Sequence, residues 1–124
     1  MSKTITALCA AMCLVTAAAT PAGIRHFALS KSAPAKDAVV AAPSEIRLWF
    51  TEAPEDNSVA IRLVGAGDAM VTTGDVTQDQ ADAKVFSVAV PGALPAGAYT
   101  VAWRGVGDDG HAVRGDFTFT VVAP

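Results

Sequence analysis

A chain of 124 residues has the length of one domain, and 52% of its residues are hydrophobic. From residue 26 onward, seven basic residues stand against twelve acidic ones, which gives this part a net charge of −5 without a visible basic stripe. This balance argues against nucleic acids and anionic membranes as partners, and it is compatible with binding a cation.

The first predicted element is a secretory signal peptide. Lys3 precedes an apolar stretch, residues 5–19, that ends in three alanines, which is the usual layout of an export leader. This stretch is short for a membrane-spanning helix. We assign the leader to residues 1–22, with its end between residues 19 and 25, and expect no membrane insertion after its removal. The alternative is a buried N-terminal helix.

Residues 26–124 are predicted to form a single all-β domain. Both cysteines, Cys9 and Cys13, fall inside the leader, so the exported domain contains no thiol for a disulfide or a thiolate-bound metal. Helical periodicity is absent. Apolar and polar residues instead alternate in short runs, and Gly, Pro and Asp clusters separate these runs.

About seven antiparallel strands are expected, with residues 75–84 as a solvated loop. In an immunoglobulin-like Greek-key β-sandwich, strands of this number and length form two packed sheets. We expect Trp49, Trp103, Phe117 and Phe119 in the core, and Tyr99 either in the core or as a hydrogen-bond donor beside a site. The predicted strands cover residues 27–30, 45–51, 58–64, 70–73, 85–91, 98–104 and 115–122.

Four blocks of sequence carry a resemblance to a known family. Starting at His26, Pro43, Leu94 and Asp109, they read His-x-x-Leu-x-x-Ser-x-Pro, Pro-x-x-Ile-x-Leu-x-Phe-Thr-Glu, Leu-Pro-Ala-Gly-x-Tyr-x-Val-x-Trp-Arg and Asp-Gly-His-x-Val-x-Gly-x-Phe-x-Phe-x-Val. In this order they resemble the CopC family of periplasmic copper-binding proteins. The resemblance covers essentially the whole of residues 26–124, the CopC-like domain.

The resemblance implies a β-sandwich that binds Cu(II) at one end. Matched by motif, the metal ligands would be His26, Asp109 and His111, with Glu52 close to the metal and the least secure of the four. It also implies a periplasmic protein that is not an enzyme. Such a protein sequesters copper for homeostasis or resistance, or hands it to or from an inner-membrane copper transporter.

The chemistry of these residues agrees with the implied site. Imidazole and carboxylate groups are donors that Cu(II) accepts. Asp109 and His111 are two residues apart, so on an extended segment their side chains would share a face, and Gly110 allows the backbone to bend between them. The preceding Trp103 and Arg104 are candidates to hold the loop by packing and by a hydrogen bond.

The mature N-terminus decides whether His26 also offers its amine. Signal peptidase requires small residues before the cut, and Arg25 precedes His26. Cleavage after Ala19 or Ala22 would leave His26 inside a short tail with only its imidazole available. An end at Ile24 would allow the amine, backbone amides and imidazole to bind Cu(II) together.

Three further interpretations remain to be weighed. After the leader the chain has a single methionine, Met70, so a separate Cu(I) site of thioethers is not expected. A metal-free immunoglobulin-like adhesion or assembly module would have the same strands and would treat residues 109–111 as a turn. A copper oxidase of the histidine-brace type would need an N-terminal His26. No hydrolase motif is present.

Overall fold

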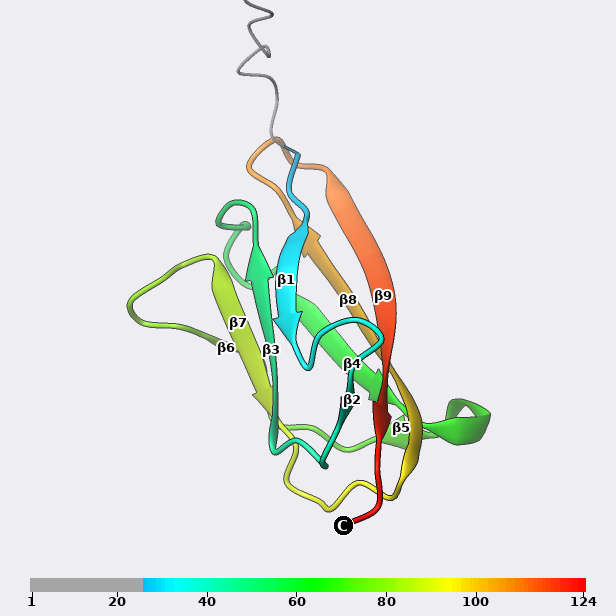
Figure 1. Cartoon of the computed structure of the whole chain (residues 1–124). Coiled ribbons are helices and arrows are strands. Elements are labelled where there is room, and N and C mark those ends of the chain that lie inside the picture. Colours follow the sequence, from blue (N-terminus) through cyan, green and yellow to red (C-terminus); the bar gives the residue numbers. More distant parts are fainter. Residues whose placement is uncertain (1–25) are drawn as a thin grey trace, which may run out of the picture.

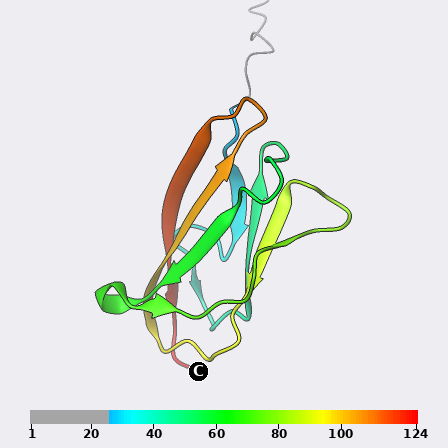
Figure 2. The same cartoon turned by 180° about the vertical axis from the view of Figure 1, so that it is seen from behind.

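The computed structural model describes residues 26–124, which form two β-sheets packed against each other (Figures 1 and 2). The predicted all-β, immunoglobulin-like sandwich is confirmed. The predicted leader, residues 1–22, lies outside the described residues. One sheet contains, in spatial order, β1 (Leu29–Ala33), β3 (Glu45–Phe50), β7 (Val85–Ala89) and β6 (Thr77–Gln78); the other contains β2 (Val39–Val40), β9 (Ala112–Val121), β8 (Gly97–Val106), β4 (Ala60–Val64) and β5 (Met70–Val71).

The core consists of the apolar residues that alternate along the longer strands. In β3, Ile46, Leu48 and Phe50 are at most 3% exposed, whereas the residues between them face outward. Trp103, Phe117 and Phe119 are buried, as predicted. A single short 3₁₀ turn, Ala66–Asp68, follows β4. No helix in residues 26–124 is both long enough and apolar enough to cross a membrane.

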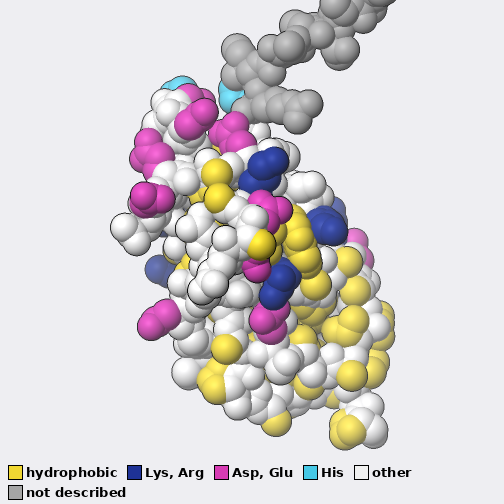
Figure 3. All heavy atoms as spheres, turned by 90° about the vertical axis from the view of Figure 1, so that its left-hand side faces the viewer, with side chains coloured by type: hydrophobic (Ala, Val, Ile, Leu, Met, Phe, Trp, Pro, Cys, Tyr) yellow, Lys and Arg dark blue, Asp and Glu magenta, His cyan; other side chains and the backbone are white. Residues whose placement is uncertain are grey.

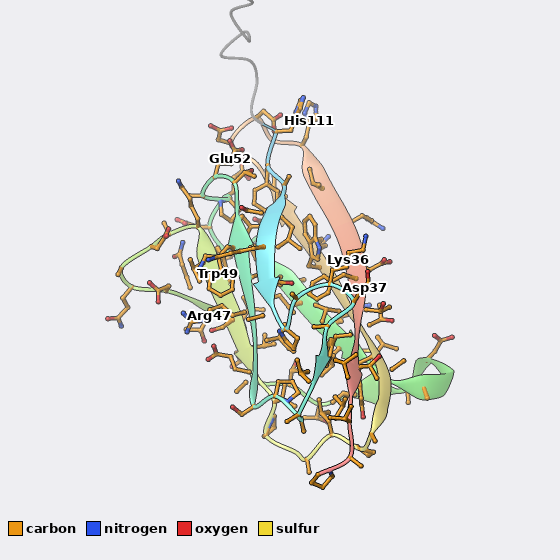
Figure 4. The ribbon with its side chains drawn as sticks, in the orientation of Figure 1. Lys36, Asp37, Arg47, Trp49, Glu52 and His111 are labelled. Carbon is orange, nitrogen blue, oxygen red and sulfur yellow. The ribbon has the colours of Figure 1, made fainter. Side chains whose placement is uncertain are left out.

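Trp49 does not belong to the core, so the prediction for this residue was wrong. It lies on the outer face of β3, where the Lys31 ammonium is 4.6 Å and the Arg47 guanidinium 5.9 Å from the centre of an indole ring (Figure 4). The reason is the strand period of two, because Ile46, Leu48 and Phe50 already occupy the inner face. Contact with two cations stabilises the outward ring.

Tyr99 is a packed strand residue. Its ring is buried and stacks on Phe119 with centroids 5.7 Å apart, and its hydroxyl donates a hydrogen bond of 2.6 Å to the carbonyl of Pro95. These contacts lie where Gly97 pairs with Val121, at the end of the hairpin opposite His111. Tyr99 therefore stabilises the sandwich far from the predicted copper ligands.

Two short strands were not predicted. β6 lies within residues 75–84, which we expected to form a loop, and pairs with β7 through Thr77 and Gln78. β2 pairs with β9, and this pair is parallel, so the sandwich is not purely antiparallel. A strand of two residues has no alternation that a sequence could reveal, because its conformation depends on the neighbouring strand.

The hairpin of β8 and β9 places the predicted site. Both strands are longer than predicted and pair without interruption from Gly97 and Val121 to Val106 and Ala112. The loop of residues 107–111 therefore lies at one end of the sandwich, where the described chain begins, whereas the C-terminus lies at the other end (Figure 1).

Phe27 fixes the start of the domain to this end. It precedes β1, which begins two residues later than predicted, and its ring is 2% exposed. The ring centroid lies 4.6 Å from that of Phe50 and 6.2 Å from that of Trp103. A Cβ on Gly105 would be 2.6 Å from Cζ of Phe27, so this close approach requires glycine.

We expect Phe27→Ala to lower the free energy of unfolding by about 3 to 5 kcal/mol, because it removes a buried aromatic ring and leaves a cavity. Urea unfolding followed by tryptophan fluorescence would measure this change. Val39→Ala is the control, since Val39 is 66% exposed and its truncation should change stability little. Equal effects of the two substitutions would contradict the role of Phe27.

Candidate metal centre

The four predicted ligands come from three segments that meet at one end of the sandwich. Asp109 and His111 lie in the loop between β8 and β9, Glu52 follows β3, and His26 precedes β1. Glu52 and His111 are labelled at this end in Figure 4. Figure 3 shows both histidine side chains at the same end, among several acidic side chains. The fold thus brings together residues that are up to 85 positions apart in the sequence.

Asp109 and His111 form the best-defined part of the site. One carboxylate oxygen of Asp109 accepts a hydrogen bond of 3.0 Å from the His111 backbone N–H, and the other lies 3.0 Å from Nδ1 of the His111 ring. The imidazole side chain is 80% exposed, and no hydrogen bond to its Nε2 occurs within residues 26–124. The carboxylate therefore orients a ring whose outer nitrogen is available to an ion.

The two side chains meet through a turn rather than on an extended segment, and the bend at Gly110 is the one that we expected. Gly110 has a φ of +82°, and its N–H donates to the carbonyl of Gly107 over 3.0 Å. The Gly107 N–H in turn donates to the carbonyl of His111 over 3.1 Å. Because glycine adopts positive φ without steric cost, Gly110 allows the chain to reverse and the Asp109 carboxylate to reach His111.

The hydrogen bonds from His111 lower the pKa of Asp109. The backbone N–H of His111 has the largest effect, followed by its ring, with smaller electrostatic contributions from His111 and from His26. These interactions outweigh a slight loss of solvation that acts in the opposite direction. Asp109 therefore stays negatively charged in mildly acidic solution, and the side chain of His26 lies close enough to affect it.

The carboxylate of Glu52 approaches that of Asp109 beside Gly107. A Cβ built on Gly107 would lie 3.0 Å from Oε1 of Glu52 and 3.2 Å from Oδ1 of Asp109, so both oxygens approach the same position. The same Cβ would be 2.9 Å from Cβ of Phe27. The absence of a side chain at Gly107 allows these groups to come together.

Thr51 connects His26 to this end, and our sequence analysis did not identify it. Its hydroxyl donates to the His26 carbonyl over 3.1 Å and accepts from the Ala28 N–H over 3.0 Å. Its backbone N–H also donates to the Ala28 carbonyl. Thr51 stands directly before Glu52 in the Phe-Thr-Glu block, a position in the sequence that could have indicated a role beside the site.

The predicted ligands lie at the same end but do not form a complete metal cage. Within residues 26–124, no three His, Cys, Asp or Glu side chains are near enough to one another to hold an ion as they stand. Trp103 packs against Phe27 and Phe50, as expected of a residue that supports the loop. Arg104 is exposed and makes no hydrogen bond to residues 107–111 in the described part of the chain, so the expected bond is absent.

Comparison with known proteins identifies the family. The model of the CopC domain matches residues 29–122. The chain belongs to the CopC family. Protein YobA of Escherichia coli K12 is 34% identical over 109 residues, which cover 87% of this chain and 88% of YobA. Copper resistance protein C of Escherichia coli is 33% identical over 107 residues, which cover 77% and 81% of the two chains.

Solved structures of this family have the same fold. The crystal structure of PcoC, a methionine-rich copper resistance protein from Escherichia coli, superposes with a TM-score of 0.71 at 34% identity, covering 78% of this chain and 99% of PcoC. The crystal structure of CopC from Methylosinus trichosporium OB3b gives a TM-score of 0.70 at 28% identity, covering 77% and 93%. Unlike a methionine-rich protein, this CopC chain has only Met70 after residue 25.

We expect Asp109 to titrate below the value of about 3.9 that is usual for an aspartate. The hydrogen bonds to His111 favour the charged carboxylate, so they persist as the pH falls and are lost only as it passes through the lowered pKa. Carboxyl carbon NMR of the metal-free protein would follow this titration. His111→Ala removes the ring but keeps the backbone N–H, which has the largest effect, so the pKa of Asp109 should rise only part of the way towards its usual value. A pKa that does not move would contradict the contribution of the ring.

Proposed function

We propose that this CopC protein binds Cu(II) in the periplasm through His111, Asp109, His26 and, less directly, Glu52. The observation that carries the proposal is the oriented pair of Asp109 and His111, with Glu52 and His26 beside it, at the end of a sandwich of this family. Two known relatives are named copper resistance protein C or PcoC. The predicted export leader supports a periplasmic location.

The donor set fits Cu(II) better than Cu(I). Imidazole nitrogen and carboxylate oxygen suit the divalent ion, whereas Cu(I) favours thiolate and thioether sulfur. Residues 26–124 contain no cysteine, and Met70 lies beyond β4, away from the loop that carries His111. The pair of Asp109 and His111 would accept the ion first, and His26 and Glu52 would complete the set after small movements of their side chains.

The exposure of the site supports a role in copper transfer as well as sequestration. The His111 side chain is 80% exposed, so a partner's ligand could approach a bound ion directly. Copper could then pass between this protein and an inner-membrane transporter by stepwise exchange of ligands. A deeply enclosed site would hold the ion against such exchange.

We expect His111→Ala to weaken Cu(II) binding by more than the roughly 10- to 100-fold that is typical for residues that only orient a metal ligand. Competition titration against a chromophoric Cu(II) chelator would measure the affinity. Asp108→Asn is the matched control, because Asp108 is an exposed acid in the same loop without a bond to His111 among residues 26–124.

Asp109→Asn would then show whether Asp109 is a ligand or only orients His111. A loss as large as that of His111→Ala would make it a ligand, and a loss of about 10- to 100-fold would make it an orienting residue. If the folded wild-type protein bound no Cu(II), or if His111→Ala bound it unchanged, the proposed site would be wrong. The first of these results would favour the metal-free adhesion or assembly module.

Cu(II) affinity should fall on acidification from neutral pH, because protons compete with the ion for the imidazole nitrogens. Asp109 remains charged throughout this range, since its pKa is lowered, so the loss should come from the histidines. The same competition titration, repeated from neutral to mildly acidic pH, would measure it. An affinity that does not change with pH would rule out binding through imidazole.

A further inference from the structure

Most basic residues of this acidic domain line two hollows that meet at β9. Five of the seven basic residues in residues 26–124 line two adjoining hollows, and of the twelve acidic residues only Asp116 does so. Both hollows include Trp103 of β8 and Arg114, Gly115 and Asp116 of β9. We call this surface the basic face; its basic residues are Lys31, Lys36, Arg62, Arg104 and Arg114.

The first hollow lies on the outer face of the five-stranded sheet, and this sheet is the nearer one in Figure 2. Its volume is about 740 Å³. Strand pairing places the small residues Ala60 and Ala102 next to the long side chains of Arg62, Arg104 and Arg114. Short residues beside three arginines create a depression that is lined by positive charge.

Two of these arginines lie opposite each other and repel one another. Arg104 and Arg114 are direct partners across β8 and β9, and like charges in this position destabilise a sheet. Within residues 26–124, neither forms an ion pair with an acidic side chain. Asp116 lines the same hollow, but the three arginines outnumber it, so a negatively charged ligand would reduce the repulsion between Arg104 and Arg114.

The second hollow is a groove of about 530 Å³ between β1 and β9. Leu29, Trp103, Val113 and Phe117 give it an apolar lining, and Lys36 and Arg114 add positive charge, whereas the ammonium of Lys31 lies over Trp49. β1 is an edge strand. On this side of β9, β2 pairs only with Thr120 and Val121, so residues 112–116 have no strand partner there among the described residues.

We propose that the basic face binds an extended acidic segment of a partner protein. An added strand would pair with the free backbone groups of β1 or of residues 112–116, and its apolar side chains would enter the groove. Its carboxylates would meet Lys36, Arg104 and Arg114, and would relieve the repulsion between the two arginines. A bare phosphate backbone offers nothing for the apolar groove, which favours a polypeptide over a nucleic acid.

The test uses the full exported protein without copper, so that it is independent of the proposed metal site. The probe is a fluorescein-labelled peptide in which glutamate alternates with valine, long enough to pair with a strand of about five or six residues. Fluorescence anisotropy measures binding at low and at high salt. A peptide with glutamine in place of every glutamate is the uncharged control.

The informative variant is the double substitution Arg104→Glu with Arg114→Glu, and its matched control is Arg47→Glu with Lys84→Glu. Both variants change the net charge equally, but Arg47 in β3 and Lys84 just before β7 line neither hollow. We expect binding of the acidic peptide to weaken about tenfold or more in the first variant, to weaken with salt, and to change little in the control.

The single substitution Arg104→Glu separates binding from stability. It converts the opposed arginines into an opposite-charge pair with Arg114, so Tm should rise while affinity for the acidic peptide falls. Equal binding by wild type and both double variants would overturn the proposal. Binding of the uncharged peptide as tightly as the acidic one would do the same, as would tighter binding of a short DNA duplex or of phosphatidylglycerol vesicles with the same sensitivity to Arg104 and Arg114.

Discussion

The close contact between Phe27 and the two glycines at the end of β8 is the constraint on which the rest of the candidate site depends. The Phe27 ring occupies the space that a side chain on Gly105 would need, and its Cβ lies against Gly107. Because the ring also packs on Phe50 and Trp103, it joins the two sheets at this end. The residue before it, His26, is thereby held beside the loop that carries His111.

The site itself combines a rigid part and an adjustable part. The hairpin of β8 and β9 is fully paired up to the loop, and within the loop the Asp109 carboxylate contacts both the backbone N–H and the ring Nδ1 of His111. Glu52 and His26 reach the same region from other segments without closing a cage. A site of this kind suits an ion that must be both captured and released, since each step requires only small side-chain movements.

Acidic and basic side chains gather in different places on the domain. Acidic residues lie around the end with the histidines (Figure 3), where they favour the approach of a cation. Most basic residues lie along β1, β4, β8 and β9, beside a groove with unpaired strand edges. A partner protein bound there would lie next to the loop of residues 107–111, because Val113 and Arg114 line the groove and begin the strand that follows His111.

The sequence by itself determined the fold class, the longer strands and the four candidate ligands, because alternation with a period of two and the motif blocks are local patterns. The same alternation, applied strictly, would also have placed Trp49 on the outer face. Only the tertiary structure decided what depends on distant neighbours: the two short strands β2 and β6, the support of His26 by Thr51, and the approach of Glu52 to Asp109 at Gly107. The basic face is the clearest case, since Arg62, Arg104 and Arg114 are far apart in the sequence and become neighbours only through strand pairing.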